Sequence, residues 1–170
     1  MKIETTKVEK IKISEIDRLD PVTAILEDFG PGRGKIIIEC YGKSWSSSWG
    51  GMGKDTKICQ FFCSCDEHYL AGNLSSINSA VIDIDKITEH ARVQIIASRK
   101  TGDISAVDAR DLYDDVEWIE EPLDYELMHK IYGDEWWHSL PDKINPDYEY
   151  LCRIILAVKA ALKTTLLKAA

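Results

Sequence analysis

The sequence predicts an α+β fold: an N-terminal antiparallel β-hairpin or small sheet with one packed helix, followed by a mainly helical C-terminal half. Three observations lead to this prediction. Early segments alternate apolar and polar residues, a glycine-rich turn separates two of them, and later segments repeat apolar residues every three or four positions. With 170 residues and an apolar fraction of 45%, the chain is long enough to bury a sizeable core.

The strands are expected in the first quarter of the chain. Residues 8–13 (VEKIKI) alternate strictly, and residues 22–29 and 35–41 are apolar runs on either side of the turn sequence GPGRG. Glycine and proline supply turn geometry, so these two runs are predicted to form a hairpin. The following residues 42–53 (GKSWSSSWGGMG) are expected to form an aromatic and glycine-rich loop.

A single helix is expected next, capped by Asp55 or Thr56 and ending near Gly72. Its apolar stripe would contain Ile58, Phe61, Phe62, Cys65, Tyr69 and Leu70. On one continuous helix the nearby thiols and imidazole point in different directions, and their spacing matches no common zinc motif. We therefore expect no joint metal site, no cofactor and no catalytic centre among Cys59, Cys63, Cys65 and His68.

The second half is expected to be helical. Segments beginning at Asp85, after Ser105 and at Asp124 show helical spacing, and Asn145-Pro146 is a typical helix start. The last helix carries an apolar stripe made of Leu151, Ile155, Val158, Leu162 and Leu166. A stripe of this size needs a cover, so we expect it to dock on the other helices or to pair with another chain.

Domain organisation and location follow from composition. We expect a small α+β unit over residues 1–75 and a helical unit over 80–170 that contains an acidic segment at 103–150, with one compact domain as the alternative. The chain has no apolar leader segment and no run of about 18 apolar residues, so neither a signal peptide nor a membrane span is predicted. A cytoplasmic protein is expected.

The negative charge is concentrated in one segment. The chain has a net charge of −8, and residues 103–150 contain 15 acidic and 3 basic residues, whereas residues 1–102 are balanced. No basic stripe of the kind that neutralises phosphates is present. Direct nucleic-acid binding is therefore disfavoured, and the expected partner is a protein with a basic surface.

The candidate partner-binding residues are acidic and aromatic. They are Asp108, Asp111, Asp114, Asp115, Glu117, Trp118, Glu120, Glu121, Trp136 and Trp137. The alternative is that these carboxylates only keep the protein soluble. A secondary candidate surface consists of Trp45 and Trp49, which could instead form a lid over the local core.

One stretch resembles a known group of proteins. The run CYGKSWSSSWGGMGKDTKICQFFCSCDEHYLAGNL contains a W-x3-W-G-x-M-G segment followed by an F-F and Y-L helix. In this it resembles small accessory proteins of phages and prophages of enteric bacteria, over residues 22–74. The resemblance implies a phage origin, and small acidic phage proteins often act by binding host machinery.

These observations favour a non-enzymatic interaction protein of a phage or prophage. We expect it to bind a host complex that handles nucleic acid or defends the cell, and to inhibit or redirect that complex. Its acidic surface would mimic nucleic acid. Two other classes stay open. One is an accessory enzyme with a nuclease-like or thiol-dependent activity, and the other is a structural module whose last helix self-associates. A homodimer is compatible with each of the three classes.

Overall fold

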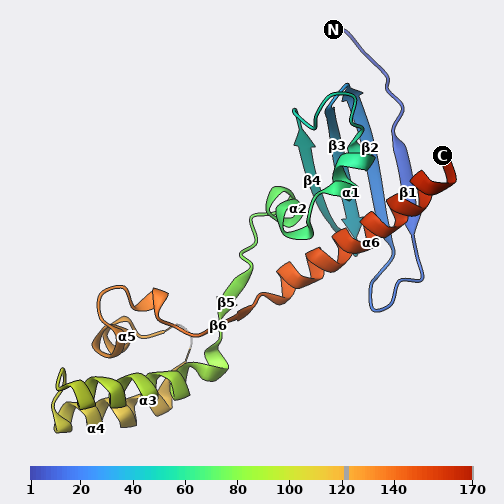
Figure 1. Cartoon of the computed structure of the whole chain (residues 1–170). Coiled ribbons are helices and arrows are strands. Elements are labelled where there is room, and N and C mark those ends of the chain that lie inside the picture. The colour runs from blue at the N-terminus through green and yellow to red at the C-terminus, as the bar shows by residue number, and fades with distance from the viewer. Residues whose placement is uncertain (121–122, 170) are drawn as a thin grey trace. The chain divides into compact units, whose positions relative to one another are not determined.

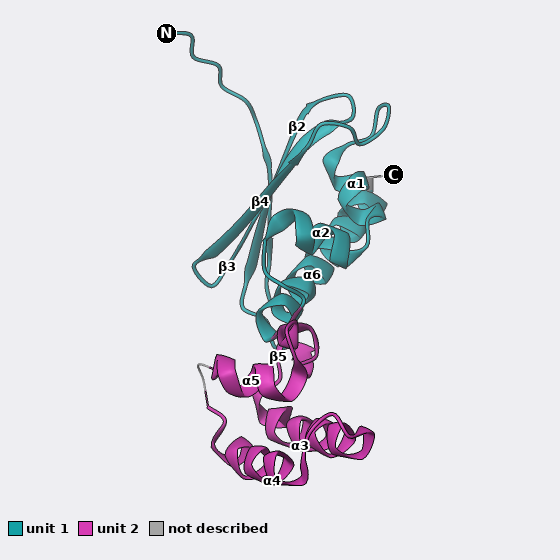
Figure 2. Ribbon diagram, turned by 90° about the vertical axis from the view of Figure 1, so that its left-hand side faces the viewer, with its two compact units in different colours: residues 1–79, 146–170 teal, residues 80–145 magenta. Residues whose placement is uncertain are grey.

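The computed structural model describes residues 1–120 and 123–169, and the chain forms two compact units (Figure 1). Unit 1 comprises residues 1–79 and 146–170, and unit 2 comprises residues 80–145 (Figure 2). Each unit has a hydrophobic core of its own. The α+β class is confirmed, because a four-stranded antiparallel sheet precedes the helices.

The elements of unit 1 are β1 (Glu9–Ile13), β2 (Val22–Gly30), β3 (Arg33–Cys40), β4 (Lys43–Trp49), α1 (Ile58–Ser64), α2 (Glu67–Leu74) and α6 (Pro146–Ala169). Those of unit 2 are β5 (Ala80–Ile82), α3 (Ile84–Thr101), α4 (Ala106–Asp115), the 3-10 turn η1 (Val116–Trp118), α5 (Tyr125–Tyr132), the 3-10 turn η2 (Trp136–His138) and β6 (Asp142–Ile144). Unit 2 is thus one continuous segment that begins and ends with a short strand.

The sheet of unit 1 has the strand order β1-β2-β3-β4, and every neighbouring pair is antiparallel. The turn between β2 and β3 depends on Gly32, which has a φ of +66°. A Cβ atom at this position would lie 2.3 Å from the carbonyl oxygen of Gly53, and the amide of Met52 donates to the carbonyl of Gly32 at 2.8 Å. The glycine-rich segment after β4 therefore closes against the hairpin turn.

The prediction of a loop over residues 42–53 is wrong for the first half of that range, because residues 43–49 form strand β4. The sequence KSWSSSW has the period of two that a strand requires. Trp45 and Trp49 lie on the inner face, opposite Ile38 and Gly34 of β3, and the alternate serines are exposed. Serine is a weak strand former, so the pattern of inward tryptophans is the feature that specifies this edge strand.

All three helices of unit 1 lie on one face of the sheet (Figure 2). The core between them contains fully buried side chains from the sheet, such as Ile36 and Ile38, and from α1, such as Phe62. Gly34 lets α1 approach β3 closely, since a Cβ there would lie 2.8 Å from Cβ of Ile58. The opposite face of the sheet carries polar and half-buried residues, as is usual for antiparallel sheets.

Helix α6 belongs to unit 1 and packs against the sheet, α1 and α2. Its buried residues are Leu151, Cys152, Ile154, Ile155, Val158 and Leu162. We expected residues 80–170 to form one helical unit with this helix docked on the preceding helices; the observed division instead ends that unit at Asn145. An apolar stripe specifies that a helix is covered but not which surface covers it, and here α1, α2 and the inner face of the sheet cover α6 together.

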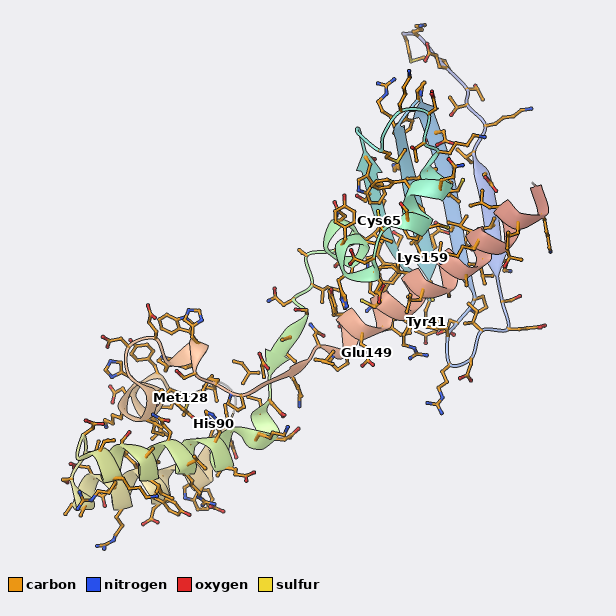
Figure 3. All side chains as sticks on the ribbon, in the orientation of Figure 1. Tyr41, Cys65, His90, Met128, Glu149 and Lys159 are labelled. Carbon is orange, nitrogen blue, oxygen red and sulfur yellow. The ribbon has the colours of Figure 1, made fainter. Side chains whose placement is uncertain are left out.

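The predicted continuous helix over residues 58–72 is two helices. Helix α1 ends at Ser64, and α2 starts after Asp66, whose carboxylate accepts a hydrogen bond from the amide of Tyr69 at 2.8 Å. The extended backbone of Cys65 separates them, and its carbonyl accepts a hydrogen bond from the ammonium group of Lys159 on α6 (Figure 3). The capping aspartate and this tertiary contact together outweigh the helical apolar spacing.

Unit 2 begins and ends in the two-stranded ribbon β5–β6, in which Ala80 pairs with Ile144. Its core lies between α3, α4 and α5 and includes Ala91, Ile95, Leu112, Val116, Met128 and Ile131. Ser105 and Asp124 cap α4 and α5, each accepting a hydrogen bond from the amide three residues ahead. In the part of the chain that the structure describes, no helix is long and apolar enough to cross a membrane.

Candidate functional site

The negative charge of the protein resides in unit 2. This unit carries sixteen acidic and seven basic residues, a net charge of −9, whereas the remainder of the chain carries +1. The acidic segment inferred from the sequence is therefore part of one compact body with its own core. A basic partner would be attracted to this unit and not to unit 1.

Helix α4 positions four of the candidate aspartates. Buried Leu112 fixes the side of the helix that faces the core of unit 2. At 100° per residue, Asp108, Asp111, Asp114 and Asp115 then fall within an arc of roughly 120°, which starts at Asp108, about 40° from Leu112, and ends at Asp114 on the opposite side. All four are exposed, so the helix presents one continuous acidic face to solvent.

The four aspartates differ in their local bonds. Asp108 is bound into the N-terminal cap, since the Ser105 hydroxyl donates to its carboxylate at 2.6 Å and accepts from its amide at 3.1 Å. Among the described residues, no side chain donates a hydrogen bond to the carboxylates of Asp111, Asp114 or Asp115. These three are the charges of α4 that a partner can engage without first breaking an internal bond.

A shallow hollow of about 400 Å³ lies beside this face. Asp108, Asp111 and Asp115 of α4 line it together with Lys130 of α5. Asp103 lines the hollow as well, so four carboxylates against one ammonium group leave it negative. A cationic side chain of a partner is therefore the complementary occupant.

The remaining acidic candidates are not all available. Glu117 forms an ion pair with Arg92 of α3, and the guanidinium group of Arg92 also lies 4.8 Å from the centre of the Tyr113 ring. Glu120 is exposed. Glu121 lies outside the described residues. The structure therefore assigns Glu117 an internal role in joining α3 to η1.

The tryptophans of unit 2 occupy different environments. Trp118 is 82% exposed and Trp137 is 49% exposed, so both can contact a partner. Trp136 is half-buried against the core, makes an edge contact with Tyr125 at 6.2 Å, and has a buried indole nitrogen without an acceptor among the described residues. Trp136 is thus mainly a packing residue.

The secondary pair in unit 1 belongs to the core. Trp49 is 8% exposed, its indole nitrogen donates to the hydroxyl of Tyr69 at 3.1 Å, and its ring packs 5.5 Å from that of Phe61. Trp45 is half-buried against the same core. These contacts fit the alternative of a lid over the core.

The thiols of Cys59, Cys63 and Cys65 are half-buried against the core of unit 1. Burial raises the pKa of Cys59, Cys63 and Cys65 above the ordinary thiol value, which opposes formation of the thiolate that a nucleophile or metal ligand requires. The Cys63 thiol donates to the carbonyl of Lys159 at 3.8 Å. Among the residues described here, no three histidine, cysteine or acidic side chains are grouped so as to hold a metal ion.

A family model for phage proteins, Phage_phiTE_072, matches residues 1–164 and so spans both units. The chain belongs to this phage family. No curated protein and no solved structure matches it significantly. The resemblance inferred over residues 22–74 is thereby supported at the level of a phage protein family.

This phage protein also has an apolar groove that the sequence did not reveal. It has a volume of about 480 Å³ and lies on α3 and α4, where Ile95, Ile96, Ala109 and Tyr113 meet the stems of Arg99, Lys100 and Arg110. Exposed Ile96 and the basic residues beside it interrupt the regular apolar spacing of α3, so the sequence of α3 alone does not indicate a groove. The groove exists because α3 and α4 pack against each other in the folded unit.

Proposed function

We propose that this phage protein binds a host protein with a basic surface through the acidic face of α4, and thereby inhibits or redirects a complex that handles nucleic acid or defends the cell. The observation that carries the proposal is the placement of the charge. One compact unit has a net charge of −9, and one of its helices turns four aspartates outward without a matching set of cations.

The physical basis is electrostatic attraction between the acidic face and a surface that normally binds phosphates. A field of one sign raises the rate of encounter with a basic partner and disfavours nucleic acid itself. Asp111 and Asp115 form no ion pair with a described side chain, so a partner's cation can bind them without breaking one. The exposed Trp137 of the same unit can add an apolar contact. The raised pKa values of the thiols favour this function over a thiol-dependent enzyme.

The proposal is tested by capture and kinetics. The full chain is immobilised, a lysate of the host bacterium is passed over it, and bound proteins are identified by mass spectrometry and purified. Association is then measured against salt concentration. Binding should weaken steeply as the screening length falls from roughly 30 Å at 0.01 M to about 8 Å at 0.15 M salt.

A double charge-reversal variant tests whether the acidic face of α4 is the surface that binds the host protein. Asp111→Lys with Asp115→Lys should slow association about tenfold or more, while dissociation changes less, because steering acts on encounter. The matched control, Asp17→Lys with Glu39→Lys, makes the same charge change at exposed positions of unit 1. If both double variants associate at the wild-type rate, the acidic face only confers solubility and the proposal is wrong.

A further inference from the structure

The apolar groove between α3 and α4, called the α3–α4 groove below, lies on a different side of α4 from the acidic face. The two helices run side by side in unit 2 (Figure 1). Counted around α4 from Leu112, the aspartates of the acidic face lie about 40–160° away in one direction. Ala109, Tyr113 and Arg110, which line the groove, lie about 60–160° away in the other direction. The two surfaces therefore share a helix but no residue.

The groove is apolar and open to solvent. Buried Ile95 lines it together with Ile96 and Tyr113, which are 44% and 39% exposed. Val93, one turn before Ile96 on α3, is 62% exposed and extends the apolar surface along the helix. Single exposed apolar side chains are common on protein surfaces, but a group of them around a groove indicates a binding site.

The cations beside the groove have no partner within the protein. Arg99, Lys100 and Arg110 line the groove and are exposed, and none of them forms an ion pair with a described side chain. Among the described residues, no acidic side chain lines the groove. The other four basic residues of unit 2 each pair with a carboxylate or line the acidic hollow, and they are Lys86, Arg92, Lys130 and Lys143. The unmatched cations of an acidic unit are thus gathered at one place.

Helix stability does not account for all three cations. Arg99 and Lys100 lie in the last turn of α3, where positive charge interacts favourably with the helix dipole. Arg110 lies in the middle of α4, where this effect is absent. Its position beside Ala109 and Tyr113 is better explained by a ligand that combines apolar groups with negative charge.

We propose that the α3–α4 groove binds an acidic amphipathic segment of another protein. Apolar side chains of that segment would pack on Ile96 and Tyr113, and its carboxylates would pair with Arg99, Lys100 and Arg110. An amphipathic helix that lays its apolar face in a groove is a recurring mode of peptide recognition. A volume of about 480 Å³ accommodates a few side chains, so the anchor is a short segment.

The partner has the opposite charge to the partner of the acidic face. The inference therefore does not rest on the host-binding function. The net charge of −9 on unit 2 repels an acidic segment at long range. At 0.15 M salt the screening length is about 8 Å, so the three cations at the groove dominate once the segment is in contact.

The test uses a synthetic peptide, because the natural segment is unidentified. The probe is a labelled helical peptide with leucines one turn apart on one face and glutamates beside them, titrated with the full chain at 0.15 M salt and followed by fluorescence anisotropy. Two matched peptides carry glutamine in place of every glutamate, or alanine in place of every leucine. Each should bind about tenfold or more weakly than the probe, since one lacks the charge and the other lacks the apolar groups. A glutamine peptide that binds as well as the probe, or a probe that does not bind, contradicts the proposal.

Variants of the full chain locate the binding. Arg110→Glu should weaken peptide binding about tenfold or more, whereas Arg110→Lys, which keeps the charge, should retain most of it. The control Lys54→Glu makes the same charge change at an exposed position of unit 1 and should have little effect. Ile96→Ala should weaken binding about fivefold, and Val107→Ala should not, because Val107 is exposed on α4 outside the groove. Circular dichroism confirms that each variant is folded.

Two further measurements separate this partner from other occupants. Anionic phosphatidylglycerol vesicles that bind the chain and compete with the peptide would assign the groove to a lipid surface. Sedimentation velocity that shows a dimer of the wild type, abolished by Arg110→Glu, would assign it to a second copy. Either result, or peptide binding that survives both Arg110→Glu and Ile96→Ala, overturns the proposal. Asp111→Lys with Asp115→Lys should bind the peptide at least as well as the wild type, so this test and the test of the acidic face fail independently.

Discussion

Asp83 shows how one side chain can stabilise unit 2. It is 4% exposed, and its carboxylate lies 3.3 Å from the ammonium nitrogen of Lys143 and 3.4 Å from that of Lys86. Its amide donates to the carbonyl of Pro141 at 2.8 Å. The residue therefore ties the start of α3 to the segment around β6, at the point where the chain enters and leaves the unit.

The ion pairs of Asp83 predict a pH dependence. Burial opposes ionisation of the carboxyl, but the two lysines outweigh it and hold the pKa below its ordinary value. The contribution to folding is then complete above the unfolded pKa of about 4 and is lost as the pH falls through the folded pKa. Asp83→Asn should lower the melting temperature by several degrees at neutral pH, and the difference from wild type should shrink in acid.

Thermal unfolding followed by circular dichroism from neutral to acidic pH measures this effect. Asp85→Asn is the matched control, because Asp85 also contacts Lys143 at 3.0 Å but is exposed. Its effect should be small at every pH, as for surface ion pairs in general. A pH-independent difference between wild type and Asp83→Asn would mean that the ion pairs do not contribute.

At the scale of elements, α6 completes the core of unit 1. Truncation after Tyr150 removes buried Cys152 together with five buried aliphatic side chains, namely Leu151, Ile154, Ile155, Val158 and Leu162, and exposes the apolar face of the sheet. Full burial of each such side chain contributes about 1.5–3 kcal/mol, which together is comparable to the whole stability of a domain. The truncated chain is expected to be insoluble or unfolded.

Truncation after Leu166 is the matched control. It removes only the end of α6, where Leu167 is 81% exposed, so the protein should remain soluble and fold. Expression, solubility and circular dichroism of the two truncations decide the matter. A soluble, folded chain ending at Tyr150 would show that the helix is peripheral to unit 1.

The elements also show what could be predicted from the sequence. Alternation, apolar runs and turn residues were sufficient to predict β1, β2 and β3, and helical spacing was sufficient to locate α4 and α5. Spacing alone does not give the exposure of every α4 aspartate, because Asp108 and Asp115 fall within about 60° of buried Leu112 around the helix. Spacing could not reveal that Cys65 breaks the helix, since the break depends on Lys159, which is 94 residues away in sequence. The apolar groove on α3 and α4 was missed for the same reason.

For the whole molecule, the main feature is that unit 2 is a continuous insertion into unit 1. Its first and last strands pair antiparallel, with Ala80 opposite Ile144, so the two ends of the insertion are adjacent. Directly paired residues have Cα atoms about 5 Å apart, a distance that a few glycine and serine residues can span. The net negative charge comes from the insertion, which carries −9, whereas the remaining chain has a net charge of +1.

Replacement of residues 80–144 by a short glycine and serine linker should therefore leave unit 1 folded, because none of the residues in its core cluster lies in the deleted segment. Its unfolding in urea should remain cooperative and reach a midpoint close to that of unit 1 in the full chain. The same variant should lose host-protein binding, because the acidic face is gone. The full chain with Asp111→Lys and Asp115→Lys is the comparison, because it keeps the insertion but reverses two charges of the acidic face. If the deletion variant still binds the host protein, the interaction surface lies on unit 1 and the proposed function is wrong.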